Sequence, residues 1–150
     1  MSAWDKDFPI LDRHLGEWEG EYVHLDPDGN EVDRHASHLR MWVPEDGSCD
    51  IKQINTYTWP DGRQEAVEFP GILKGKDVFF STDRIEGHMH QSDELTILLT
   101  WTYNELLKPG NYLYELIQLS RDGQQKVRTW HWMEEDRLVR RTVIREYKKA

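Results

Sequence analysis

Polar and apolar residues alternate along most of the chain, in short runs that turn sequences separate. Alternation with a period of two is typical of strands that are buried on one face and solvated on the other. The pattern predicts nine or ten strands, and no segment between them has the period of 3.6 that a further long helix would need. The strands are expected over residues 17–26, 31–43, 49–58, 64–73, 77–84, 87–91, 95–106, 112–120, 126–133 and 137–147.

Four of the turns carry the same dipeptide, Asp-Gly, at residues 28–29, 46–47, 61–62 and 122–123. Glycine accepts the positive φ that a tight connection between two twisted strands needs, so Asp-Gly indicates hairpins. Nine or ten meandering strands left as an open sheet would expose two edges, and closure removes both. The predicted fold is therefore all-β, a closed antiparallel up-and-down barrel formed by a single domain, residues 1–150.

One short helix is expected before the first strand, over residues 7–15. Pro9 suits the first turn of a helix, and Gly16 can take the left-handed conformation that follows the last turn. Phe8 and Leu11 lie on one face of such a helix. This apolar face predicts a short N-terminal helix that covers one end of the barrel.

The first strand begins with Gly16-Glu17-Trp18-Glu19-Gly20-Glu21-Tyr22, which places a Trp between two glycines directly after the predicted helix. This motif and the strand rhythm resemble the calycins, the superfamily of the lipocalins, the fatty-acid-binding proteins and the nitrobindin-like proteins. A tight turn at 27–30 stands where fatty-acid-binding proteins insert two helices, and the C-terminal helix of secreted lipocalins has no counterpart here. The resemblance is nearest to nitrobindin-like or small bacterial lipocalin-like barrels, and it implies a ligand held inside the barrel.

The net charge of −9 argues against a nucleic-acid partner or an anionic membrane surface, since both favour basic proteins. No run approaches the roughly 18 apolar residues of a membrane-spanning helix, so membrane insertion is not expected. The first residues include acidic side chains and lack the apolar core of a secretory signal, which predicts a cytoplasmic protein. A single cysteine, Cys49, excludes an intramolecular disulfide. The sequence leaves open whether two copies of the chain form a homodimer.

Arginines gather late in the sequence, on the last two predicted strands. Because Arg140 and Arg141 fall on opposite faces of the last strand, at least one guanidinium must point inward, where it needs a partner. In calycins, an Arg of the last strand packs over the Trp of the first strand. The resemblance therefore implies that Arg140 or Arg141 covers Trp18 and closes the barrel end through a cation–π contact.

A second use of the late arginines follows from the fatty-acid-binding proteins, in which an Arg-x-Tyr sequence near the C-terminus binds the ligand carboxylate. Arg145-Glu146-Tyr147 resembles that sequence, and Arg128 would supply a second cation. Structural closure is the simpler interpretation of an inward Arg, and carboxylate binding stays open beside it.

Large aromatic side chains are numerous, with seven Trp and six Tyr. Rings of this size fill cores and also line ligand pockets. We expect Trp101, Tyr103, Tyr114 and His131 to line the interior of the barrel. The sequence thus predicts an intracellular carrier or sensor for a small hydrophobic molecule, with a carboxylic acid as one candidate ligand.

The main alternative is a barrel enzyme, such as an isomerase, cyclase or lyase, in which a polar residue inside the barrel moves protons. Tyr57, Glu68 and Glu115 join Tyr103, Tyr114 and His131 as candidates for that residue. No motif in the sequence fixes a reaction.

A haem or bilin-type chromophore is a third alternative, since calycin relatives include haem binders and bilin lyases. His88 and His90 share one face of a strand, and His131 lies on another strand. Three convergent imidazoles would suit zinc, and one could bind haem iron. Nothing in the sequence brings His131 to the pair, so we expect neither a metal nor another cofactor.

Overall fold

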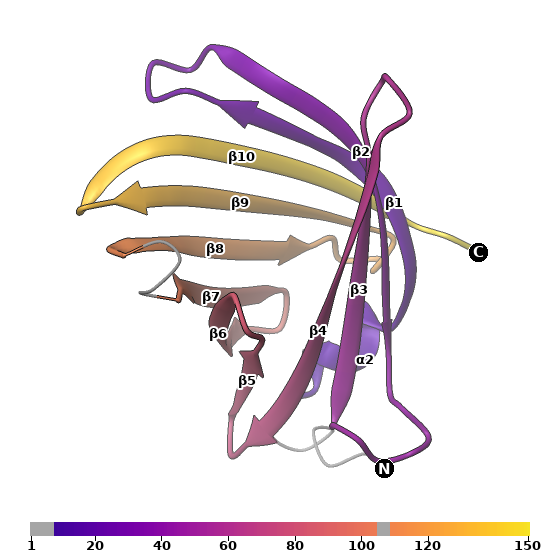
Figure 1. Ribbon diagram of the computed structural model, residues 1–150. Helices are drawn as coiled ribbons and strands as arrows, with labels where there is room; N and C mark the ends of the chain where they lie inside the picture. Colours follow the sequence, from indigo (N-terminus) through magenta and orange to yellow (C-terminus); the bar gives the residue numbers. More distant parts are fainter. Residues whose placement is uncertain (1–7, 105–108) are drawn as a thin grey trace.

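Ten antiparallel strands pair in chain order within residues 8–104 and 109–150, the parts of the chain that the computed structural model describes (Figure 1). The first strand pairs with the last, so the sheet closes into a barrel and the predicted fold class is confirmed. Within the described residues every strand therefore has a hydrogen-bonded neighbour on each side, although β4 meets β5 only over Gly71–Lys74. The elements are α2 (Ile10–His14), β1 (Gly16–Leu25), β2 (Glu31–Trp42), β3 (Ile51–Thr58), β4 (Gln64–Lys74), β5 (Asp77–Ser81), β6 (Ile85–Asp93), β7 (Thr96–Tyr103), β8 (Asn111–Leu119), β9 (Gln125–Glu134) and β10 (Arg137–Lys148).

The largest departure from the predicted strands lies between β5 and β6, where a turn replaces the expected strand end at residues 82–84. The Thr82 hydroxyl closes this turn by accepting hydrogen bonds from the backbone N–H groups of Arg84 and Ile85. This turn has no Asp-Gly pair, and the sequence pattern placed the break between the two strands at residues 85–86 instead. Residue 7 of the predicted helix and residues 105–106 of the predicted seventh strand lie outside the described residues.

Helix α2 lies at the end of the barrel where β1 begins (Figure 1). Phe8, Ile10 and Leu11 are almost fully buried in the apolar core at this end. The Trp18 indole Nε1 donates a 3.0 Å hydrogen bond to the backbone oxygen of His14, which ties the helix to the first strand. The predicted covering helix is therefore present, in a shorter form. No helix of the described residues is long and apolar enough to cross a membrane.

The ring of Trp18 is fully buried, but the cation that covers it differs from the expected one. Lys126 Nζ of β9 lies 4.2 Å from the ring centroid, and Lys148 Nζ of β10 lies 5.6 Å from it. The prediction that Arg140 or Arg141 covers Trp18 is wrong. The register places Trp18 opposite Lys148 and puts Arg141 at the far end of the same ladder, opposite Leu25.

Two glycines allow close approaches that shape the barrel. A Cβ atom on Gly20 would lie 1.9 Å from the backbone oxygen of Arg145, so only glycine lets β1 pack against β10 at this point. A Cβ atom on Gly87 would lie 2.4 Å from the Trp101 ring, which occupies the space that a side chain would fill. Gly20 thus serves the closure, and Gly87 sets the position of a ring in the interior.

Candidate functional site

The barrel encloses a cavity of about 550 Å³, within the usual range for small-molecule sites. Leu11 and His14 of the short helix line one end of this cavity. Its walls are mostly aliphatic and aromatic, and charged side chains such as Asp33, Arg84 and Arg140 line the other end. The cavity therefore has an apolar body and a polar mouth.

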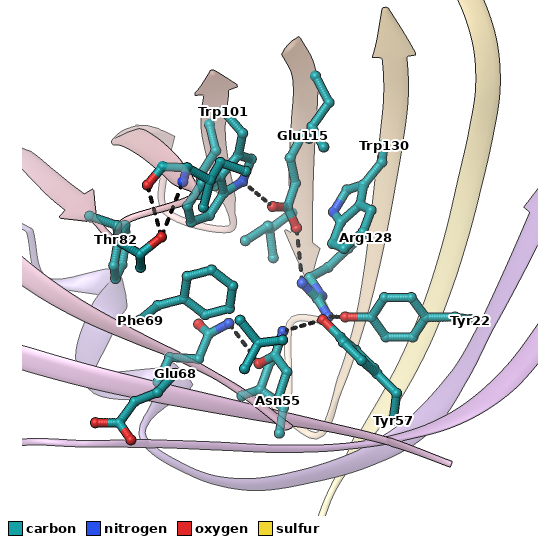
Figure 2. Close-up of a pocket in the computed structure, with 18 of the residues that line it drawn as sticks. Tyr22, Asn55, Tyr57, Glu68, Phe69, Thr82, Trp101, Glu115, Arg128 and Trp130 are labelled. Carbon is teal, nitrogen blue, oxygen red and sulfur yellow. Dashed lines mark hydrogen bonds and ion pairs between the residues drawn. The ribbon is translucent and has the colours of Figure 1, made fainter. Parts of the chain in front are cut away.

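Aromatic rings face this cavity from opposite walls. On β7 and β9, Tyr103 and Trp132 stack with centroids 6.0 Å apart, and Trp130 meets Trp132 edge-on at 5.4 Å. On the opposite wall, Tyr57 lies on β3 (Figure 2). Figure 2 shows Trp101, Phe69 and Trp130 arranged with Tyr57 around a central space. Such a space is shaped for a molecule that stacks between rings.

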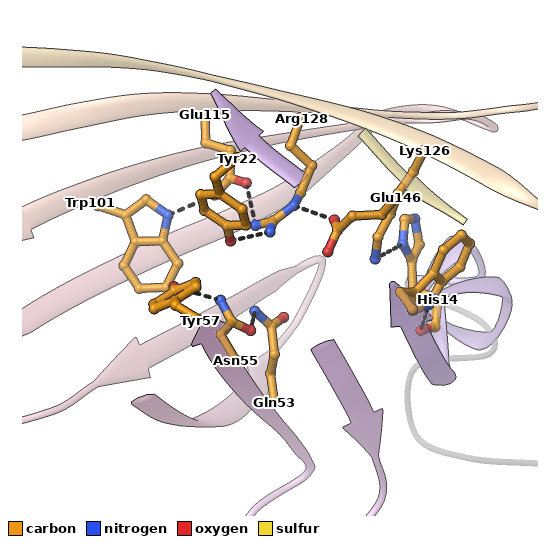
Figure 3. Close-up of polar contacts among 11 residues, drawn as sticks. His14, Tyr22, Gln53, Asn55, Tyr57, Trp101, Glu115, Lys126, Arg128 and Glu146 are labelled. Carbon is orange, nitrogen blue, oxygen red and sulfur yellow. Dashed lines mark hydrogen bonds and ion pairs between the residues drawn. The ribbon is translucent and has the colours of Figure 1, made fainter. Parts of the chain in front are cut away.

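A buried polar cluster is formed by Arg128, Glu115, Glu146, Tyr22 and Trp101, and all of these except Glu146 line the cavity (Figure 3). The guanidinium donates from Nε to Glu146 Oε1 at 2.7 Å, from Nη1 to Glu115 Oε2 at 3.1 Å, and from Nη2 to the Tyr22 hydroxyl. Trp101 Nε1 donates to the other oxygen of Glu115 at 2.9 Å. We call this set the Arg128 cluster; it joins five strands around one buried cation.

The charges in the Arg128 cluster are held by one another. Arg128 is 3% exposed, Glu115 4% and Glu146 1%, so bulk water solvates none of these side chains. Burial acts to lower the pKa of Arg128, but Glu146 and the other partners raise it well above its usual value. Burial also raises the pKa of Tyr22 well above 10, which keeps the phenol neutral beside the guanidinium. Both carboxylates bind the one cation, so the cluster has one more carboxylate than cation, and Glu146 Oε2 is buried without a hydrogen bond to the described residues.

The floor of the cavity carries a second cation, Lys126. Its Nζ lies 3.5 Å from His14 Nδ1 and above the Trp18 ring. Burial lowers the pKa of Lys126 to about 8, so the amine is mostly protonated at neutral pH. Burial, with Lys126 as the next cause, lowers the pKa of His14 well below 6.5 and keeps that imidazole neutral.

A chain of hydrogen bonds fixes two further histidines on the cavity wall. Trp132 Nε1 can only donate, so it donates to Thr142 Oγ1 at 2.8 Å, and the same oxygen lies 2.8 Å from His24 Nδ1. The Ala36 carbonyl can only accept, so a neutral His35 donates to it from Nδ1 at 3.4 Å and accepts at Nε2 from His24 Nε2 at 2.9 Å. His24 Nδ1 then accepts from the Thr142 hydroxyl. Both rings are neutral in this arrangement, and burial lowers the pKa of His24 to about 4.

These neutral histidines predict a loss of stability in mild acid. The His24 pKa is about 4 in the folded chain and 6.5 in the unfolded chain, so below pH 6.5 the unfolded state binds more protons. Stability should fall as the pH drops from about 6.5 to about 4, and by about 2 kcal/mol between pH 7 and pH 5 from His24 alone. Urea unfolding at the two pH values measures this. His24→Gln should reduce the loss and the exposed His131→Asn should keep it; equal stability at pH 7 and pH 5 would contradict the assignment.

Three of the predicted ligand-binding residues line the cavity. Arg128 and Trp101 belong to the Arg128 cluster, and Tyr103 stacks on Trp132 farther along the wall. The enzyme candidates Tyr57 and Glu115 also face the cavity. Contact of any of them with a ligand stays a prediction.

Four of the predicted ligand-binding residues lie on the outer face of the barrel, so their expected inward orientation is wrong. They are Arg145, Tyr147, Tyr114 and His131, and all four are exposed. On β10 the inward series is Thr142, Ile144 and Glu146, because Ile144 pairs with the buried Tyr22. Glu68 borders the cavity, but its carboxylate is half exposed and binds Lys52 Nζ at 2.7 Å, so it is not a buried acid of the kind expected for an enzyme.

Sequence reasoning missed several polar residues of the interior, above all Glu146, Lys126 and His14. Lys126, Arg128 and Trp130 are spaced two residues apart on β9, and this spacing could have shown that all three share one face of the strand. Glu146 points inward between two exposed neighbours, as alternation requires, although it is charged. Because the sequence rule is that charged residues face water, it assigns such positions to the wrong face.

Solved structures with similar folds cover nearly the whole chain. One is a protein of unknown function from the DUF3598 family of Nostoc punctiforme PCC 73102, with a TM-score of 0.71 and 16% identity over 93% of this chain and 49% of that chain. The present chain thus spans about half the length of the Nostoc protein. A second is the S-type phycobiliprotein lyase CPES from Guillardia theta, with a TM-score of 0.73 and 10% identity over 95% of this chain and 92% of that chain.

The protein Rv2717c from M. tuberculosis matches with a TM-score of 0.66 and 11% identity, over 97% of this chain and 98% of that chain. At such identities these likenesses establish the fold alone. None of the curated proteins matches the sequence. The family model described as "Domain of unknown function (DUF3598), N-terminal" matches residues 3–150, and the chain therefore belongs to that family.

Proposed function

We propose that the barrel is a binding protein for a flat, conjugated and largely apolar small molecule held in the cavity. The observation that carries this proposal is the cavity of about 550 Å³ between walls of aromatic rings. A ring system that stacks between such walls buries both of its faces. Open-chain tetrapyrroles, the bilins, are one class of molecule with this shape. The likeness of fold to a phycobiliprotein lyase supports the choice of a bilin as the first ligand to test.

One polar group of the wall indicates what the ligand should carry. The indole Nε1 of Trp130 is buried and makes no hydrogen bond to the described residues. A buried donor without a partner costs free energy, and a ligand carbonyl oxygen could accept from it. The proposed ligand is therefore a conjugated molecule with a carbonyl group.

The Arg128 cluster argues against Arg128 as the anchor of a ligand carboxylate. The expectation of an acid rested on a guanidinium without a partner, whereas Arg128 binds Glu115 and Glu146. A third carboxylate would bring negative charge to a cation that two carboxylates already neutralise. Arg128 also holds one oxygen of Glu115 and one of Glu146. These two groups are therefore better placed to hold the cation than to transfer protons to a substrate, which favours a binding protein over an enzyme.

The proposal is tested by titrating the full chain with biliverdin while following its absorbance and the tryptophan fluorescence. We expect saturable binding of one molecule per chain. Tyr103→Ala removes a stacking ring from the cavity and should weaken binding about tenfold, the effect of about 1.4 kcal/mol of lost contact. Tyr114→Ala is the matched control, because Tyr114 lies on the neighbouring strand and is 52% exposed on the outer face.

Equal weakening by both substitutions would show that biliverdin binds outside the cavity and would overturn the proposal. Parallel titrations with a long-chain fatty acid and its alcohol test the other ligand class. Tight binding of either, without binding of biliverdin, would replace the conjugated ligand by an aliphatic one.

A further inference from the structure

The outer face of the β5–β6 hairpin carries a group of three potential metal ligands, Asp77, His88 and His90. The antiparallel register places Asp77 directly opposite His90, and His88 lies two residues earlier on the same face of β6. One ligand atom from each residue lies within 4.8 Å of the other two. Met89, between the two histidines, points the other way into the barrel and is buried. The group is therefore separate from the cavity.

The contact between His88 and Asp77 has the spacing of two ligands of one ion. His88 Nε2 lies 3.1 Å from Asp77 Oδ1, yet this nitrogen is buried and makes no hydrogen bond to the described residues. Zinc binds imidazole nitrogen and carboxylate oxygen at about 2.0–2.2 Å, so two such atoms at a tetrahedral ion lie roughly 3–3.5 Å apart. The observed distance is in that range.

Neighbouring side chains hold the group in position. The His88 ring stacks on Phe79, with centroids 4.6 Å apart and planes inclined by 3°. Lys74, which pairs with Asp77 across β4 and β5, extends over the Phe79 ring at 5.6 Å from its centroid. An imidazole whose orientation is fixed before the ion arrives loses less conformational entropy on binding.

We propose that Asp77, His88 and His90 form a binding site for Zn²⁺ on the outer face of the barrel. Two imidazoles and one carboxylate suit zinc, whereas Mg²⁺ and Ca²⁺ prefer oxygen ligands alone. His90 is exposed, so the fourth position of a tetrahedral ion is open to water. The third ligand is Asp77 and not His131, the histidine that the sequence offered beside His88 and His90. His131 lies on β9.

The site is tested by isothermal titration of the full chain with zinc chloride, after any purification tag has been removed. We expect one zinc per chain. The variants Asp77→Asn, His88→Asn and His90→Asn should each weaken binding about tenfold or more, because each removes a ligand. His131→Asn is the matched control, an exposed strand histidine outside the group, and should bind zinc like the parent chain. An excess of Mg²⁺ should not displace the zinc.

A simple ion pair between a protonated His88 and Asp77 is the competing explanation of the 3.1 Å contact. It needs no third residue, so His90→Asn separates the two. The proposal is overturned if His90→Asn leaves zinc affinity unchanged, if His131→Asn weakens it as much, or if the parent chain binds no zinc. Nitrogen chemical shifts of the histidine rings give an independent readout: zinc should shift those of His88 and His90 and leave that of His131.

Discussion

Replacing Arg128 with Met should lower the free energy of unfolding by about 3–5 kcal/mol, the cost of removing one partner from a buried ion pair. The substitution keeps most of the volume of the side chain but leaves the carboxylates of Glu115 and Glu146 facing each other without their shared cation. Tyr22 also loses its partner in the cluster. Urea unfolding at pH 7, followed by tryptophan fluorescence, measures the loss.

Arg145→Met is the matched control for this prediction. Arg145 lies on the neighbouring strand and is exposed, so its replacement should change stability by no more than about 0.5 kcal/mol. Adding Glu115→Gln and Glu146→Gln to Arg128→Met should recover part of the loss, since the stranded negative charges are then removed. A loss below about 1 kcal/mol for Arg128→Met would mean that water reaches the cluster and that its charges are not mutually dependent.

Replacing Trp18 with Ala should cost about 3–5 kcal/mol of stability, the range for a large aromatic side chain in a core. The ring is fully buried, lies beneath Lys126, and binds the backbone of His14 through its indole nitrogen. Its removal leaves a void at the end of the barrel that helix α2 covers, and the helix loses its hydrogen bond to the first strand. Denaturant unfolding gives the global loss, and amide hydrogen exchange of residues 10–14 reports on the helix.

Trp42→Ala provides the comparison for Trp18→Ala. Trp42 is a partly exposed residue of β2, and Arg40 covers its ring at 4.5 Å from the centroid. We expect a loss of about 1 kcal/mol or less for this variant, with no change in exchange at residues 10–14. Similar losses for the two variants would show that Trp18 is no more important to the barrel than a surface ring.

The sequence predicted the barrel correctly because its turn chemistry and its strand period agree. Four Asp-Gly turns and a period of two define hairpins wherever they occur, and closure follows from the number of strands. These signals are local, so each can be read from its own segment of the sequence without knowing which strands pair. The turn at Thr82 was placed too late, at residues 85–86, because a side chain closes it and no dipeptide rule includes such a turn.

The orientation of β10 could not be predicted, and two of the four orientation errors in the site, Arg145 and Tyr147, lie on this strand. Val143 and Ile144 are both apolar, and Arg145 and Glu146 are both charged, so the two faces of the strand have nearly the same composition. Only the pairing of Ile144 with Tyr22 determines which face is inward. The charges that do point inward are tolerated because they bind one another across neighbouring strands, as Arg128 of β9 and Glu146 of β10 do.

The grouping of His88 and His90 was correct as far as one strand allows. Their spacing of two residues puts both rings on one face, whichever strand lies beside them. The third ligand, Asp77, depends on how many residues the turn between β5 and β6 contains, since that number sets the register of Asp77 against His90. Nothing in the sequence placed His131 beside this pair, and it lies on β9.

The pairing of β1 with β10 has a consequence for how the protein is made. A ribosome releases the first strand before the last, so Tyr22 must wait for Arg128 of β9, which binds its hydroxyl, and for Ile144 of β10, which pairs with it when the barrel closes. Until then, Arg128 and Glu115 can keep their hydration, and the unfinished sheet presents a free edge along β1. The nascent chain should therefore be most prone to aggregate just before β10 emerges, and a translational pause before that point would prolong the risk.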